Sequence, residues 1–254
     1  MGRIKVLTTL LAFAVVIGGA IFVIAKFDLL GFKEAAFDKA QVAYNAGDKE
    51  KAIALWTEAI GKYPEFAKAY GARGAAYMDL DDIDAATADW EKAVELGVKT
   101  PDAYLRLANR YLITPRYEEA IELYTKAIEI NPALGEAYAK RAFSYQKLKD
   151  YEKALADYDE AVKFETDPEI YLDRGDLREA LKDYEKAAAD YSEAIKLNPE
   201  LAAAYEKRAR NYWRLGNCDQ LEIDAKKGCE LGNCQALTLA ARCPPPKEQS
   251  QEMP

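Results

Sequence analysis

The four cysteines of the chain lie close together near its C-terminus, at Cys218, Cys229, Cys234 and Cys243. Clustered thiols can form disulfides, hold a zinc ion or take part in thiol–disulfide exchange. The ten, four and eight residues between them leave no Cys-x-x-Cys, which is the spacing typical of zinc knuckles and thiol oxidoreductases. Disulfides are therefore the favoured interpretation, with reduced, buried thiols or a four-thiolate zinc site as the alternatives.

The rest of the chain offers few groups for catalysis. It contains no histidine, which removes the usual general base near neutral pH and the commonest metal ligand. We recognise no convergent set of acid, base and nucleophile, so we predict that the protein is not an enzyme and needs no cofactor. The net charge is −8, and no basic stripe is present to neutralise phosphates. We therefore expect no nucleic-acid partner, and no small-molecule substrate either.

Arginine and aspartate recur sixteen residues apart, in pairs that themselves repeat along the chain. The pairs are Arg73 with Asp89, Arg141 with Asp157, Arg174 with Asp190, and Arg208 with Asp224. At the equivalent place between the first two pairs, Leu107 and Leu123 replace both charges together. This joint change predicts an ion pair within each unit. An anion-binding ladder is the alternative, but a charge that is already paired has little left for a ligand.

These pairs belong to a repeat of 34 residues, one unit of which is a residue shorter. Alanine or glycine recurs at equivalent positions, and large aromatic residues recur beside them. Each unit holds two blocks with apolar residues every three or four positions, which is typical of amphipathic helices. We predict antiparallel helix pairs that bury their apolar faces against their neighbours. The predicted units are residues 33–66, 67–100, 101–134, 135–167, 168–201 and 202–235.

Stretches such as AYAKRAFSYQKLKDYEKALADYDEAVKF and AYLRLANRYLITPRYEEAIELYTKAIEINP resemble the tetratricopeptide repeat family. The resemblance covers residues 33–235 and implies an all-α, right-handed α-solenoid of about six helix-turn-helix repeats. It also implies that the first helix of each repeat lines a concave groove for a protein or peptide. Leu105 and Asn109 stand where the Lys/Asn clamp of the chaperone-binding members would begin, so that clamp is not intact.

Helical phase within the first helices predicts which residues face this groove. We expect a mixed groove that is apolar in its middle and carries acidic and basic stretches toward its C-terminal side. Leu112 shares this register and, like Phe143, is also a candidate for the core. The predicted groove residues are Phe37, Gln41, Tyr44, Met78, Leu105, Asn109, Lys140, Phe143, Asp173, Asp176, Lys207, Arg210 and Trp213.

The repeat register also bears on the cysteines. It places Cys218 and Cys229 on the second helix of the last unit, while Cys234 and Cys243 bracket a short amphipathic stretch. We predict that residues 236–243 form a capping helix. Because the start of one antiparallel helix lies beside the end of the other, the favoured pairs are Cys218–Cys243 and Cys229–Cys234. Such disulfides would staple the cap to the last repeat and would require an oxidising compartment.

The N-terminus predicts contact with a membrane. Residues 1–5 carry Arg3 and Lys5, and the uncharged run of residues 6–25 would span about 30 Å as a helix, the thickness of the hydrocarbon core. A transmembrane anchor, or uncleaved signal, is favoured by this length. A cleaved secretory signal peptide is the alternative. The basic residues place the short N-terminus in the cytoplasm and the repeats outside.

These observations predict a membrane-tethered scaffold that binds a protein or peptide partner. Because the repeats look like prokaryotic versions, we expect the bacterial inner membrane, with the repeats facing the periplasm. The alternative is a secreted, soluble assembly factor or chaperone-like protein that is released by signal cleavage. Residues 244–254, which begin with three prolines, are expected to form a disordered tail.

Overall fold

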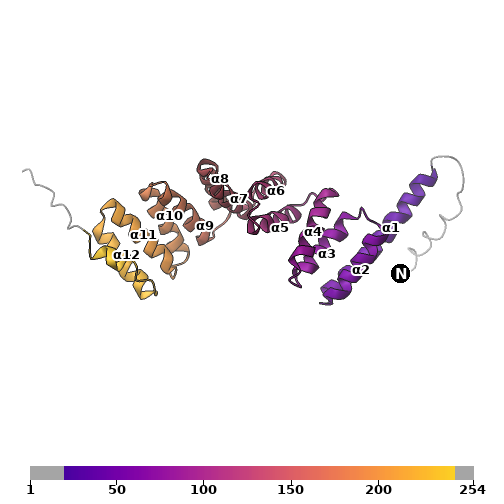
Figure 1. The fold of residues 1–254 in the computed structure, drawn as a ribbon, viewed down its shortest axis with the longest axis horizontal. Coiled ribbons are helices and arrows are strands. Elements are labelled where there is room, and N and C mark those ends of the chain that lie inside the picture. The colour runs from indigo at the N-terminus through magenta and orange to yellow at the C-terminus, as the bar shows by residue number, and fades with distance from the viewer. Residues whose placement is uncertain (1–19, 244–254) are drawn as a thin grey trace, which may run out of the picture. The chain divides into compact units, whose positions relative to one another are not determined.

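The computed structural model describes the backbone of residues 20–243 and the side chains of residues 31–243 (Figure 1). Every regular element in this range is an α-helix, which confirms the all-α prediction. The chain divides between Lys99 and Thr100 into two compact units, which are described separately. Most of the predicted anchor, residues 6–19, lies outside the described residues, as does the predicted tail, residues 244–254. Within residues 20–243, no helix is both long enough and apolar enough to span a bilayer.

The described part of the first unit, from residue 20 onward, contains four helices. They are α1 (Ala20–Asn45), α2 (Lys49–Lys62), α3 (Ala67–Met78) and α4 (Ile83–Glu95). The helix α1 runs without a break into the first predicted repeat. A cluster around Trp56, whose side chain is fully buried, forms the core between α1, α2 and α3. Asp48 and Asp82 accept hydrogen bonds from backbone amides in the first turns of α2 and α4, which satisfies donors that a helix start leaves free.

The second unit continues the same alternation of paired helices. Its helices are α5 (Pro101–Ile113), α6 (Tyr117–Ile130), α7 (Gly135–Lys147), α8 (Tyr151–Phe164), α9 (Pro168–Ala180), α10 (Tyr184–Leu197), α11 (Ala202–Leu215), α12 (Cys218–Glu230) and α13 (Leu237–Ala240). The helices α5 and α9 begin in the same way. Thr100 and Asp167 cap them with side-chain oxygens, and each has a proline in its first turn. Regular helix covers only Leu237–Ala240 of the predicted cap, residues 236–243.

The column of small residues allows the two helices of a repeat to pack closely. Gly175 on α9 faces the fully buried ring of Tyr191 on α10, and a Cβ at this position would lie 2.7 Å from the ring. A Cβ at Gly74 on α3 would lie equally close, 2.7 Å, to the indole of Trp90 on α4. Bulky aromatic side chains therefore fill the space that the small residues leave.

The predicted ion pairs within the repeats are confirmed. Their shortest nitrogen–oxygen distances are 2.6–2.7 Å, and each joins the first helix of a repeat to the second. The pairs are Arg73–Asp89, Arg141–Asp157, Arg174–Asp190 and Arg208–Asp224. In three of them the arginine also donates to a hydroxyl of the preceding repeat, for example from Arg141 Nη1 to Thr125 Oγ1 at 2.9 Å. The arginines therefore link neighbouring repeats as well as the helices of one repeat.

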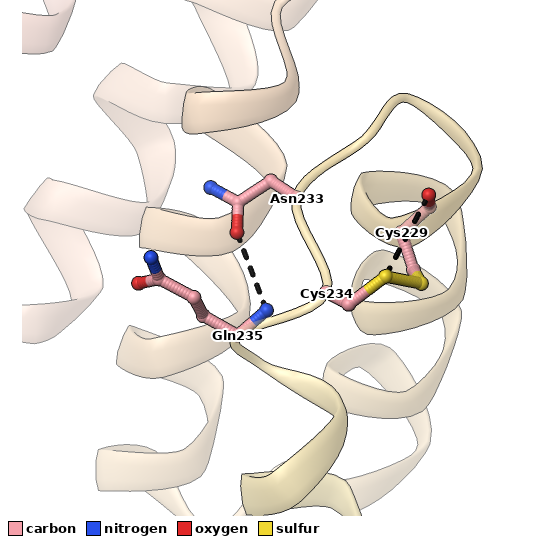
Figure 2. Close-up of a disulfide and its surroundings, with 4 residues drawn as sticks. All are labelled: Cys229, Asn233, Cys234 and Gln235. Atoms are coloured by element: carbon pink, nitrogen blue, oxygen red, sulfur yellow. Dashed lines mark hydrogen bonds between the residues drawn. A yellow bond between two sulfur atoms is a disulfide. The ribbon is translucent and has the colours of Figure 1, made fainter.

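Both predicted disulfides are present at the C-terminal end of the second unit. Cys218, at the start of α12, is bonded to Cys243, which follows α13. Figure 2 shows the second disulfide, in which Cys229 near the end of α12 meets Cys234 in the loop that leads to α13. In that loop Asn233 Oδ1 accepts a hydrogen bond from the backbone amide of Gln235. The two bonds hold the short α13 against the last helix pair.

Candidate functional site

The first helices of three successive repeats in the second unit, α5, α7 and α9, line a hollow of about 440 Å³. Its position is determined by the repeat, because equivalent faces of the first helices lie next to one another in a stack. The loop between α8 and α9 closes one side. The lining residues are Leu112, Glu136, Ala139, Lys140, Phe143, Glu165, Asp167, Glu169, Ile170 and Asp173. We refer to this feature as the hollow.

The apolar part of the hollow comes from four side chains. Phe143 lies in the middle of α7 and remains half-buried, with Lys147 Nζ 4.6 Å from its ring centroid. Ile170 on α9 is buried and also belongs to the core beneath. Leu112 and Ala139 are partly exposed at the wall. The hollow therefore presents an apolar surface that is exposed to solvent in the absence of a ligand.

The charged part of the hollow is strongly acidic. Its lining has five carboxylates and a single amine, that of Lys140. Asp167 Oδ1 is used to cap α9, where it accepts from the backbone amide of Glu169. Among the described residues, no cation lies within ion-pair distance of the carboxylates of Glu136, Glu165, Glu169 or Asp173. These groups therefore remain available for a positively charged ligand.

Asp173 is the most perturbed of these carboxylates. Its side chain is accessible to solvent, but it lies in a concave wall where protein atoms displace much of its surrounding water. This desolvation, followed by repulsion from Asp176 and Glu169, raises the pKa of Asp173 to about 6, although Lys140 and Lys207 oppose the shift. At neutral pH the carboxylate is mostly ionised and poorly compensated.

The predicted groove residues beyond the hollow in the second unit are already engaged. Lys207 Nζ on α11 lies 2.7 Å from Asp176 Oδ1 on α9. Arg210 pairs with Glu179 and Glu206, and Asp176 also accepts a hydrogen bond from the hydroxyl of Tyr191. The acidic and basic stretches predicted at this end therefore neutralise each other across α9 and α11.

The remaining predicted residues of this unit do not line the hollow. Asn109 accepts a hydrogen bond from the hydroxyl of Tyr124 at 2.6 Å, and Leu105 is half-buried one turn before it on α5. Trp213 packs against the core near the capping segment, and the guanidinium of Arg214 lies over its ring.

One predicted groove residue of the first unit, Phe37, is not exposed at the surface. Phe37 is buried, with 6% of its surface exposed, and packs against Trp56 and Phe66 in the core. The reason is that Phe37 lies three residues before Ala40, on the same stripe of α1 that faces the core. A ligand cannot reach this side chain without disrupting the first unit.

The other predicted residues of the first unit lie closer to the surface. Gln41 Nε2 donates to Asn45 Oδ1, and the hydroxyl of Tyr44 donates to Asp79 Oδ2 at 2.7 Å. Met78 is half-buried at the end of α3. Of the thirteen residues predicted for the groove, the structure therefore brings only Lys140, Phe143 and Asp173 together in the hollow.

Comparison with known proteins identifies the repeat. A family model described as "TPR repeat" matches residues 108–149 and 175–216. Two models described as "Tetratricopeptide repeat" match residues 37–93 and 135–167, so that the matches together cover more than half of the chain. The chain belongs to the tetratricopeptide repeat (TPR) family. No curated protein sequence matches it.

Several solved structures share the fold at low sequence identity. YrrB, described as "a TPR protein with an unusual peptide-binding site", is 21% identical over 74% of this chain and 96% of its own, with a TM-score of 0.62. The C-terminal part of a TPR repeat-containing protein from Cytophaga hutchinsonii is 17% identical over 77% of this chain and 78% of its own, with a TM-score of 0.64. PilF from Pseudomonas aeruginosa is 15% identical over 85% of this chain and 99% of its own, with a TM-score of 0.63.

Two residues of the hollow that the sequence analysis missed, Glu136 and Glu169, could have been found from the TPR register. Glu136 lies one turn before Lys140 on α7, and Glu169 lies one turn before Asp173 on α9. Extending the predicted stripe by one turn toward the start of each first helix would have found both. Glu165 lies in the connection between repeats, where no helical register applies. Its place at the hollow is decided by how α8 and α9 are joined.

Proposed function

We propose that this TPR protein is a membrane-tethered scaffold that binds a segment of a partner protein in the hollow. The observation that carries the proposal is the hollow itself, a solvent-accessible depression formed by α5, α7 and α9. Its apolar surface and its carboxylates, which lack ion-pair partners among the described residues, are the kind of surface that proteins keep for interaction. The peptide-binding site named for YrrB supports the proposal by similarity of fold.

The proposed location is the periplasmic face of a bacterial inner membrane, with residues 6–25 as the anchor. The apolar run and the basic residues before it support this orientation. The two disulfides support it independently, because disulfides persist in oxidising compartments and are rare in the cytosol. N-terminal sequencing of the mature protein and membrane fractionation test the anchor. A mature chain that begins after the apolar run and stays in the soluble fraction would favour the released assembly factor.

Site-specific photo-crosslinking tests the binding site. A photoreactive phenylalanine analogue at Phe143 should form a crosslink to a partner in native membranes, because this ring lines the hollow. The matched control places the same analogue at Ile223, which is 67% exposed on α12 in the same unit but does not line the hollow. Equal crosslinking at the two positions, or crosslinking only at the control, would contradict the proposed site.

A further inference from the structure

The chemistry of the hollow narrows the class of segment that it can hold. Five carboxylates and one amine line it, so a bound segment meets a field that is mainly negative. The neighbouring surface of α9 and α11 is different, because there Asp176 is paired with Lys207 and Glu179 with Arg210. The acidic groups on this neighbouring surface are therefore paired, whereas Glu136, Glu165, Glu169 and Asp173 at the hollow have no ion-pair partner among the described residues.

The carboxylates of the hollow come from three segments of the chain. Glu136 comes from the first turn of α7, Glu165 from the loop after α8, and Glu169 and Asp173 from one face of α9. Phe143 and Ile170 line the same hollow. An apolar side chain of a bound peptide that packs on Phe143 and Ile170 would share the hollow with these carboxylates. Long basic side chains that flank it in the peptide would then reach the carboxylates.

The size of the hollow agrees with a short segment of this kind. About 440 Å³ lies within the range of sites that bury small ligands, and it has room for a few side chains but not for a folded element. Lysine and arginine suit such a site, because their aliphatic stems cover apolar surface while their charged ends reach carboxylates. An acidic segment would instead place like charges opposite each other, which costs binding energy.

The environment of Asp173 supports the same conclusion. Its pKa is raised because it is desolvated and lies near Asp176 and Glu169, while Lys140 and Lys207 compensate only in part. A further cation at this position would stabilise the ionised carboxylate. Binding of a positively charged ligand next to Asp173 is therefore electrostatically favourable.

We propose that the hollow selects a basic peptide segment, in which one apolar side chain packs on Phe143 and Ile170 and flanking Lys or Arg side chains pair with Glu136, Glu165, Glu169 and Asp173. This inference rests on the proposed function, that the hollow binds a protein segment, and adds the chemistry of that segment.

Fluorescence anisotropy with the full chain in detergent tests it with three labelled peptides of equal length. The first has a leucine between lysines, the second has glutamates in place of the lysines, and the third has serine in place of the leucine. We expect the first to bind at least about ten-fold more tightly than either of the others, and its affinity to fall with added salt. Equal binding of all three, or tighter binding of the acidic peptide, would overturn the inference.

A pair of double variants locates the effect. Glu169→Gln with Asp173→Asn should weaken binding of the basic peptide about ten-fold, because two opposing charges are removed. The control, Glu200→Gln with Asp219→Asn, removes the same charge from exposed positions of the same unit that do not line the hollow, and it should leave affinity unchanged. Far-UV circular dichroism should be the same for both. Equal affinity of the two double variants would overturn the inference.

The crosslinked partner separates failure of this inference from failure of the proposed function. Mass spectrometry of the adduct at position 143 identifies the segment that occupies the hollow. A basic segment agrees with the inference. A neutral or acidic segment overturns it, although the scaffold function stands. Absence of any adduct at this position, together with no binding of the three peptides, overturns both.

Discussion

Replacing Gly175 by alanine tests the close packing on which the repeats depend. A Cβ at this position would lie 2.7 Å from Cε1 and 3.1 Å from Cδ1 of Tyr191. The ring cannot move away easily, because it is fully buried and its hydroxyl is within hydrogen-bond distance of Asp176 and Glu179. The added methyl group must therefore displace a side chain that is held at both ends.

Two opposing effects set the size of the change. Overpacking a well-filled core costs about 1–3 kcal/mol, whereas replacing glycine by alanine inside a helix favours folding by about 1 kcal/mol. The distance of 2.7 Å from the new Cβ to the ring is shorter than real Cβ contacts. We therefore expect overpacking to dominate and Gly175→Ala to lower the free energy of unfolding by about 1–2 kcal/mol. Gly71→Ala on α3 is the matched control. Its new Cβ would lie 3.9 Å from the nearest atom, so helix propensity alone should stabilise it by about 1 kcal/mol.

Urea unfolding of the full chain in detergent, followed by far-UV circular dichroism, measures both changes. A second comparison isolates the cause. In a Tyr191→Leu background the ring is absent, so adding Gly175→Ala should be neutral or stabilising relative to Tyr191→Leu alone. If Gly175→Ala were equally destabilising with and without the tyrosine ring, contact with Tyr191 would not be the reason that glycine occupies this position.

Three further predictions concern charge and the disulfides. Asp157→Ala should destabilise the chain by about 3 kcal/mol in urea unfolding, because it leaves the guanidinium of Arg141 without its buried partner. Changing both residues to leucine, the pair that the preceding repeat has, should restore most of this lost stability. Binding of a basic peptide should weaken as the pH falls through about 6, where Asp173 becomes protonated, and an Asp173→Asn variant should show a flatter pH profile in the same anisotropy titration. Replacing Cys218 and Cys243 by serine opens a loop with a sequence separation of 25 and should cost about 3.5 kcal/mol in thermal unfolding, against about 2 kcal/mol for the shorter disulfide. Equal losses for the two cysteine variants would contradict the loop-entropy explanation.

The fold could be predicted from the sequence because its interactions are local and repeated. Each repeat uses the same spacing of small, aromatic and charged residues, so that one unit reports on the others. The Arg141–Asp157 pair was predictable for this reason, since both charges are lost together in the neighbouring repeat. The disulfide pairing followed from the antiparallel order of the last two helices.

The candidate site was much less predictable, because helical phase does not say how deeply a position is buried. Phe37 shares its stripe of α1 with Ala40, and the packing of Trp56 and Phe66 against its ring shows that this stripe faces the core and not a partner. Asp176 and Lys207 were expected to face a partner, but α9 and α11 approach closely enough for the two side chains to pair with each other. Contacts between successive repeats therefore decided which charges remain available.

The sequence alone thus determined that the chain forms paired helices and which helices carry the ion pairs, and it favoured the disulfide pairing that the structure shows. These features depend on residues within one repeat or in adjacent helices. Only the tertiary structure showed that Glu165 and Asp167, from a connection between repeats, join Lys140 and Phe143 around one hollow. The physical reason is that a loop has no periodicity that predicts its direction, so its side chains are placed by the packing of the helices that it joins.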